Sequence, residues 1–136
     1  MRRTIRPKIL AVFSGLALAT TLLTGCWMLP VSIDQADDGS VQAIEVGDVI
    51  RIELAGNIST GYQWIRVAPA SLVDTPLESI EEGTYEQDDP DVCGGPGTFT
   101  FAYRAVTSGT VELGYDYARP WEPDPIDSFS IIVWVK

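Results

Sequence analysis

The chain of 136 residues contains no histidine and only two cysteines, Cys26 and Cys93. Without histidine, neither a Ser-His-Asp triad nor a Cys-His pair can be built, so hydrolases that use them are excluded. The carboxylates could include a general acid and base, but acids on an acidic surface are usually only solvated. We therefore expect no catalytic residue, no cofactor and no metal, and leave open only a loose cation site in residues 88–91 (DDPD).

Basic residues are also few, and they are unevenly placed. Four of the nine lie in the first eight positions, and the 15 residues from Ile9 to Leu23 carry no charge. A basic start followed by an apolar run of this length is typical of a secretory signal. The run is short for a membrane-spanning helix, which needs about 20 residues.

The segment that follows the apolar run is Leu23-Thr24-Gly25-Cys26. It resembles the lipobox of bacterial lipoproteins, in which the cysteine is lipidated and becomes the first mature residue. We therefore predict a lipoprotein signal peptide over residues 1–25 and a lipid on Cys26. The protein would then be held on a membrane of the bacterial cell envelope, at a periplasmic or outer surface. An ordinary cleaved signal is the alternative.

The rest of the chain is strongly acidic, with 19 acidic and five basic side chains from residue 26 onward. Such a surface repels phosphate backbones, so nucleic acid is not an expected partner. With Cys26 lipidated, Cys93 has no intramolecular partner, and the core must hold by packing alone. The length predicts one domain, which we place at residues 40–136 after a tether over residues 26–39, and we expect a monomer.

Beyond residue 40 the hydrophobic pattern repeats every second residue. Ile50, Ile52 and Leu54 alternate with more polar residues, and the same alternation occurs in residues 62–67, 98–105, 111–117 and 129–135. This pattern is typical of half-buried strands, and no segment shows a helical pattern. The sequence therefore predicts an all-β sandwich or barrel, with Trp64 in its core.

Three connections contain more polar, glycine, proline or aromatic residues than a simple turn requires. They are residues 56–61, 82–97 and 118–128. Binding residues often concentrate on loops at one end of a rigid sandwich. Arg119, Pro120 and Trp121 have the composition of a binding hot spot, although Trp121 could instead cover the core. The glycines of residues 94–97 permit close approach of another chain, although they could also form a plain turn.

Together, the three connections resemble the chagasin family of inhibitors of papain-like cysteine peptidases. The first motif of that family, Asn-Pro-Thr-Thr-Gly-Tyr before a Trp, reads here Asn57-Ile58-Ser59-Thr60-Gly61-Tyr62. The second, Gly-x-Gly-Gly before Thr-x-x-Phe, reads Gly94-Gly95-Pro96-Gly97. The third, Arg-Pro-Trp, is Arg119-Pro120-Trp121. The likeness extends from Val41 to Lys136.

The resemblance implies an immunoglobulin-like β-sandwich with three binding loops at one end, which enter the peptidase cleft and occlude it reversibly. Thr60 and Gly61 would lie nearest the catalytic cysteine of the peptidase, and Arg119 and Trp121 would grip one wall of the cleft. The implied peptidase-binding residues are Asn57, Ser59, Thr60, Gly61, Tyr62, Gly94, Gly95, Pro96, Gly97, Arg119, Pro120 and Trp121.

The chain departs from the family pattern at Ile58, Ser59 and Pro96. Ile58 replaces a proline, so the first loop must order a free φ on binding, and we expect a lower affinity. A surface immunoglobulin-like module that binds another protein or a carbohydrate through the same loops is the alternative function. For Cys93, a mixed disulfide with the peptidase is the alternative to a passive thiol.

Overall fold

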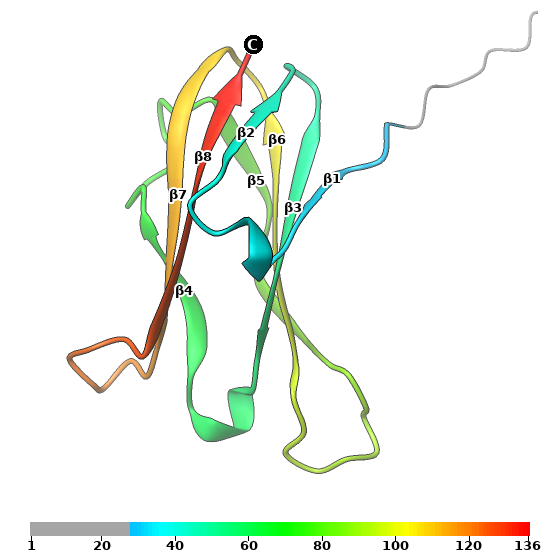
Figure 1. Cartoon of the computed structure of the whole chain (residues 1–136), viewed down its shortest axis with the longest axis vertical. Helices are drawn as coiled ribbons and strands as arrows, with labels where there is room; N and C mark the ends of the chain where they lie inside the picture. Colours follow the sequence, from blue (N-terminus) through cyan, green and yellow to red (C-terminus); the bar gives the residue numbers. More distant parts are fainter. Residues whose placement is uncertain (1–27) are drawn as a thin grey trace, which may run out of the picture.

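The computed structural model describes residues 28–136 and consists of two four-stranded sheets packed face to face (Figure 1). The first sheet has the strand order β1 (Val31–Ile33), β3 (Val49–Gly56), β6 (Gly97–Ala105) and β5 (Leu77–Gln87). The second has the order β2 (Val41–Ile44), β8 (Asp127–Val135), β7 (Gly109–Ala118) and β4 (Gln63–Ala68). Two short 3-10 helices, η1 (Gln35–Asp37) and η2 (Ile58–Thr60), complete the fold.

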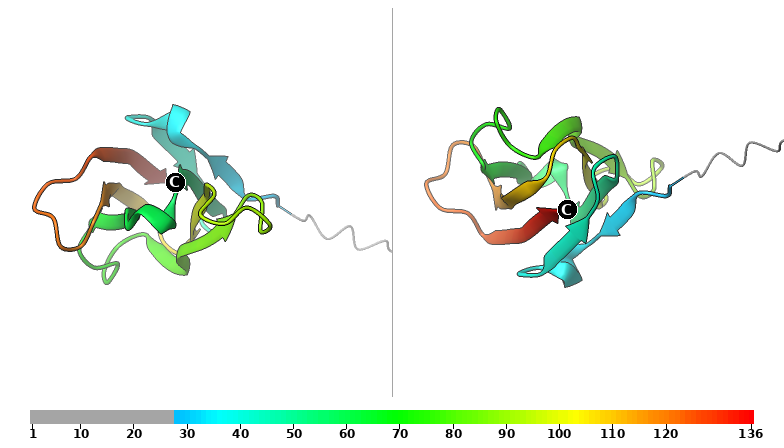
Figure 2. Two further views of the ribbon diagram at one scale, coloured as in Figure 1. Left: turned by 90° about the horizontal axis from the view of Figure 1, so that it is seen from below. Right: turned by 90° about the horizontal axis from the view of Figure 1, so that it is seen from above.

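This arrangement is an immunoglobulin-like β-sandwich, and the predicted fold class is confirmed. The two end-on views of Figure 2 show the sheets as separate layers. The buried hydrophobic side chains come from both sheets. The predicted signal peptide, residues 1–25, and the predicted lipidation site, Cys26, lie outside the described residues. Among residues 28–136, no helix has the length and hydrophobicity that crossing a membrane requires.

Alternate residues of the strands fill the core, as the period of two predicts. Ile50, Ile52 and Leu54 of β3 are fully buried, and Leu113 and Val133 of the second sheet are fully buried as well. Burial of each such side chain contributes about 1.5–3 kcal/mol. Trp64 is only 4% exposed, so its predicted place in the core is also correct.

Two tyrosine hydroxyls are buried in this core and form a hydrogen bond with each other. The Tyr115 hydroxyl donates to the Tyr103 hydroxyl at 2.8 Å, and the Tyr103 hydroxyl donates to Glu82 Oε2 at 3.2 Å. Burial raises the pKa of both phenols, so they stay neutral and keep the protons that they donate. Arg66 pairs with Glu82 at 3.3 Å, which closes the chain of polar groups at the edges of β4 and β5.

Residues 31–37, which the sequence predicted as part of the tether of residues 26–39, form β1 and η1 of the sandwich. β1 pairs in parallel with β3, with Val31 opposite Ile50 and Ile33 opposite Ile52. Ile33 is 2% exposed and joins the core. The prediction missed β1 because an alternating pattern cannot be recognised in a strand of three residues.

Candidate functional site

The three predicted segments meet at one end of the sandwich, the lower end in Figure 1. Residues 57–62 connect β3 to β4 and form loop 1, and residues 88–96 connect β5 to β6 and form loop 2. Residues 119–126 connect β7 to β8 and form loop 3. Loop 1 lies between the other two, as the side-chain contacts below establish (Figure 1).

The sheet register places loops 1 and 2 at the same height. Gly56, the last residue of β3, pairs with Gly97, the first residue of β6, and Gly97 also pairs with Gln87 at the end of β5. A Cβ at Gly97 would lie 2.6 Å from the Tyr85 hydroxyl oxygen. Only glycine fits this position, and it allows β5 and β6 to pair closely up to the point where loop 2 begins.

Loop 1 is shaped by its own polar residues. The Asn57 side chain caps η2, because its Oδ1 accepts from the Ser59 N–H at 3.0 Å and from the Ser59 hydroxyl at 2.5 Å. The Thr60 hydroxyl donates to the Asn57 carbonyl at 2.6 Å. Gly61 then ends η2 with a left-handed φ of 83°, a conformation that favours glycine.

Hydrogen bonds tie loop 1 to loop 2. Asn57 Nδ2 donates to the Gly94 carbonyl at 2.9 Å, and the Ser59 hydroxyl lies 3.2 Å from the same oxygen. Asn57 therefore shapes loop 1 and also fixes its distance from loop 2. Cys93, next to Gly94, is exposed.

Arg119 ties loop 1 to loop 3. Its Nε donates to the Thr60 carbonyl at 3.0 Å, and its guanidinium carbon lies 4.2 Å from the centre of the Tyr62 ring. Arg119 Nη1 also donates to Glu122 Oε1 at 2.8 Å, and the Tyr62 hydroxyl lies 3.3 Å from Glu122 Oε2. Four residues from two loops thus form one connected group.

Glu122 is the member of this group that the sequence prediction missed. The hydrogen bond from Arg119 lowers the pKa of the Glu122 carboxyl, and the same bond raises the pKa of Arg119. An acid three positions after an arginine was the available signal. It carried little weight alone, because such pairs are common on surfaces.

Tyr117, near the end of β7, lies between the core and loop 1 and contacts both. Its hydroxyl accepts from the Asn57 N–H at 2.9 Å. Its ring lies 5.5 Å from that of Tyr62 and stacks on Trp64 at 5.0 Å, measured between ring centres. An aromatic column therefore leads from the core to loop 1 and gives the loop a rigid base.

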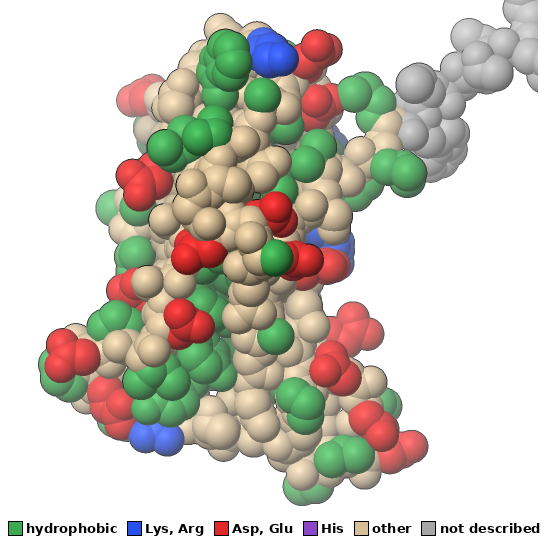
Figure 3. All heavy atoms as spheres, in the orientation of Figure 1, with side chains coloured by type: hydrophobic (Ala, Val, Ile, Leu, Met, Phe, Trp, Pro, Cys, Tyr) green, Lys and Arg blue, Asp and Glu red, His purple; other side chains and the backbone are tan. Residues whose placement is uncertain are grey.

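Trp121 is 71% exposed, so it does not cover the core, and that alternative is wrong. The other two loops also expose an apolar side chain, since Ile58 is 48% and Val92 49% exposed. Figure 3 shows hydrophobic side chains on this end of the molecule with acidic side chains beside them. A row of exposed apolar groups on a pre-ordered edge is typical of a protein-binding surface.

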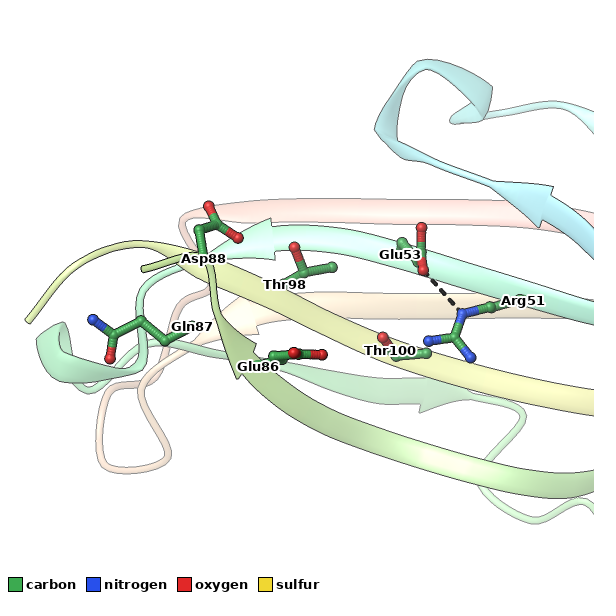
Figure 4. A pocket seen from close by; sticks show the side chains of 7 residues that line it. All are labelled: Arg51, Glu53, Glu86, Gln87, Asp88, Thr98 and Thr100. Atoms are coloured by element: carbon green, nitrogen blue, oxygen red, sulfur yellow. Dashed lines mark hydrogen bonds and ion pairs between the residues drawn. The ribbon is translucent and has the colours of Figure 1, made fainter. Parts of the chain in front are cut away.

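A polar hollow on the outer face of the first sheet lies next to loop 2 (Figure 4). Arg51 at its far end pairs with Glu53 at 2.9 Å and with Glu81 at 3.5 Å. Within residues 28–136, no group of three or more acidic or cysteine side chains is placed to hold a metal ion, and residues 88–91 form none. The hollow therefore adds no metal site to the loops.

Comparison with known proteins agrees with this geometry. The model of the family described as chagasin family peptidase inhibitor I42 matches residues 43–133. The chain belongs to the chagasin family. Chagasin from Trypanosoma cruzi is 28% identical over 106 residues, which cover 76% of this chain and 94% of chagasin. Amoebiasin-1 from Entamoeba histolytica is 28% identical over 109 residues, which cover 78% of this chain and all of amoebiasin-1.

Solved structures support the chagasin-like fold. The crystal structure of a cysteine protease inhibitor from Entamoeba histolytica superposes with a TM-score of 0.67 at 24% identity, covering 78% of this chain and 95% of the inhibitor. The structure of ICP from Leishmania mexicana gives a TM-score of 0.54 at 26% identity, covering 80% of this chain and 97% of ICP. The chain is therefore a peptidase inhibitor by family, whereas the roles of its individual loop residues stay predictions.

Proposed function

We propose that this chagasin-family protein inhibits papain-like cysteine peptidases by placing loops 1, 2 and 3 in the active-site cleft. One observation carries the proposal: loop 1 is hydrogen-bonded both to Gly94 of loop 2 and to Arg119 of loop 3. The three loops therefore act as one ordered edge. Ordering before binding lowers the entropy cost of association.

Each loop has its own part in the proposed complex. Thr60 and Gly61 sit at the turn of loop 1, where they would approach the peptidase cysteine, and the absent Cβ of Gly61 leaves room for the Trp121 indole beside them. Trp121 would fill an apolar site on one wall of the cleft, and loop 2 would run along the other wall. Inhibition would be reversible, because no covalent step is required.

We further propose that the protein is anchored by a lipid on Cys26 in the bacterial cell envelope. The direction of β1 supports this arrangement, because β1 runs parallel to β3 and β3 runs toward loop 1. The chain thus enters the sandwich from the end away from the loops, and the loops would face away from the membrane. Labelling of cells with a fatty-acid analogue tests the anchor: the wild type should be labelled and Cys26→Ser should not.

An inhibition assay tests the main proposal. The whole core lies between Val31 and Val135, so a chain of residues 28–136 retains it. We expect this chain to inhibit papain against a fluorogenic peptide, to release active enzyme on dilution and to leave trypsin unaffected. No inhibition of papain at micromolar protein would contradict the proposal and favour an immunoglobulin-like module with another ligand.

A further inference from the structure

The edge formed by the three loops has acidic side chains on both sides. Loop 2 carries Asp88, Asp89 and Asp91, and all three are exposed. On the other side, Asp124 of loop 3 and Asp127 at the start of β8 are exposed too. None of the five forms an ion pair within the described part of the chain. Figure 3 shows acidic side chains at both lower corners of the molecule.

Within residues 28–136, no free basic residue lies at the loop end to offset these charges. Arg119 is the only basic residue of the three loops, and it pairs with Glu122 at 2.8 Å. Arg51 and Arg66 pair with acids of the first sheet. Arg104 and Lys136 are at the opposite end of the sandwich, since Arg104 is next to last in β6 and Lys136 follows directly on β8. The loop end therefore carries a negative potential that charge partners within the domain do not cancel.

The charges and the apolar groups occupy different places. Loop 1, in the middle, has no charged residue, and its exposed side chains are the apolar Ile58 and the neutral Ser59 and Thr60. The acids lie to the sides, where they would face the rim of a cleft and not its floor. Charges at the rim of an interface mainly control the association rate and the choice of partner, because they stay partly solvated.

We infer that the acidic flanks direct this inhibitor to papain-like peptidases whose cleft is bordered by basic residues. The inference rests on the proposed function and adds the charge of the target to it. A basic rim would be attracted to both flanks during approach, whereas an acidic rim would be repelled by both. Loop 1 and Trp121 would make the contacts that are shared by both kinds of target.

The test compares two papain-like peptidases of known structure, one with a basic and one with an acidic cleft rim. Association rate constants with residues 28–136 are measured by progress curves in about 0.02 M and about 0.3 M NaCl. At low salt we expect association with the basic-rimmed enzyme to be at least about tenfold faster. Salt should slow this reaction and leave the other unchanged or faster.

A variant with matched controls assigns the effect to loop 2. Asp88→Asn, Asp89→Asn and Asp91→Asn together remove three charges, and the asparagine at 89 still offers an acceptor to the N–H of residue 91. The control replaces Glu45, Glu78 and Glu112 by Gln, which are exposed and form no ion pair. The loop variant should lose most of the rate advantage toward the basic rim, and the control should keep it.

The outcomes separate the two proposals. Inhibition of both peptidases with the same salt response would overturn this inference and leave the proposed function standing. An equal loss of rate in the loop variant and the control would do the same, because it would reduce the effect to net charge. Inhibition of neither peptidase would overturn both. The salt response of the wild type decides the matter even where a variant fails to fold.

Discussion

The indole of Trp121 lies directly over the backbone of Gly61, and a Cβ at position 61 would come within 2.7 Å of Trp121 Cη2. Loops 1 and 3 therefore meet at a point where the absence of a side chain makes room for a large one. The left-handed φ of Gly61, 83°, is a second reason for glycine there. The contact with Trp121 can be tested separately from the backbone strain that a non-glycine residue would have at this φ.

Gly61→Ala should weaken inhibition of papain by at least about tenfold, because the new methyl group displaces the Trp121 indole, which its Cβ would approach to 2.7 Å. The left-handed φ should also cost about 1 kcal/mol of stability, measured by urea unfolding. Gly47→Ala is the matched control, since Gly47 has a φ of 98° but nothing within 4 Å of its Cβ position. Equal effects of both variants on inhibition would contradict the role of the contact.

Trp121→Ala should reduce inhibition strongly and stability little. A side chain that is 71% exposed contributes at most about 0.5 kcal/mol to folding. Loss of a central aromatic from an interface commonly costs about 2 kcal/mol, or about 30-fold in the inhibition constant. Trp134→Ala is the control, because Trp134 is 49% exposed on β8 at the other end of the sandwich. Unchanged inhibition by Trp121→Ala would remove loop 3 from the proposed contact.

Ile58→Pro should strengthen inhibition. Ile58 is the first residue of η2, a position where proline is tolerated, and Asn57 before it is extended at φ −141° and ψ 101°. Fixing this φ should contribute about 0.4–1 kcal/mol, or about two- to fivefold in the inhibition constant. Titration calorimetry with papain measures it as a smaller entropy loss on binding. Weaker inhibition would mean that loop 1 must change shape in the complex.

The link between Arg119 and Glu122 should survive mild acid. Because the pKa of the Glu122 carboxyl is lowered, more than half of it is ionised near pH 4.3, where an ordinary glutamate is half protonated. The stabilising contribution is complete above that pH and disappears only as the pH falls through the lower pKa of the folded state.

The Trp121 indole resonance in NMR spectra reports on this link, and we expect its acid transition below pH 4.3. Glu122→Gln should lack the transition, because glutamine does not titrate but still offers an acceptor to Arg119. All other acidic side chains are the same in both proteins, so the difference between the wild type and the variant isolates Glu122. A transition at the ordinary pKa of glutamate would contradict the assigned cause.

The sequence predicted β3, β4, β6, β7 and β8, because alternation such as that of Ile50, Ile52 and Leu54 reflects one buried and one exposed face. It missed β2 and also β5, the longest strand among the described residues, and it placed residues 82–87 of β5 in a connecting loop. The only buried residue of β5 is Leu77, so its sequence does not alternate between buried and exposed residues. It did not predict β1, whose partner lies further along the chain and whose length is three residues. The loop motifs were recognisable by type. Their connection through Tyr62, Arg119 and Glu122 was not, because it depends on which strand ends the sheet register brings together.

The pairing of Gly56 with Gly97 marks a natural joint for engineering. Everything on one side of it is framework, whose packing is complete without the loops. On the other side are loops 1 and 2, which can be replaced because the Gly56–Gly97 pair fixes where both leave the sheet. Segments from other inhibitors, exchanged for residues 57–62 and 88–96 together, would begin at the same level and keep their alignment. A single scaffold could in this way be directed to different peptidases.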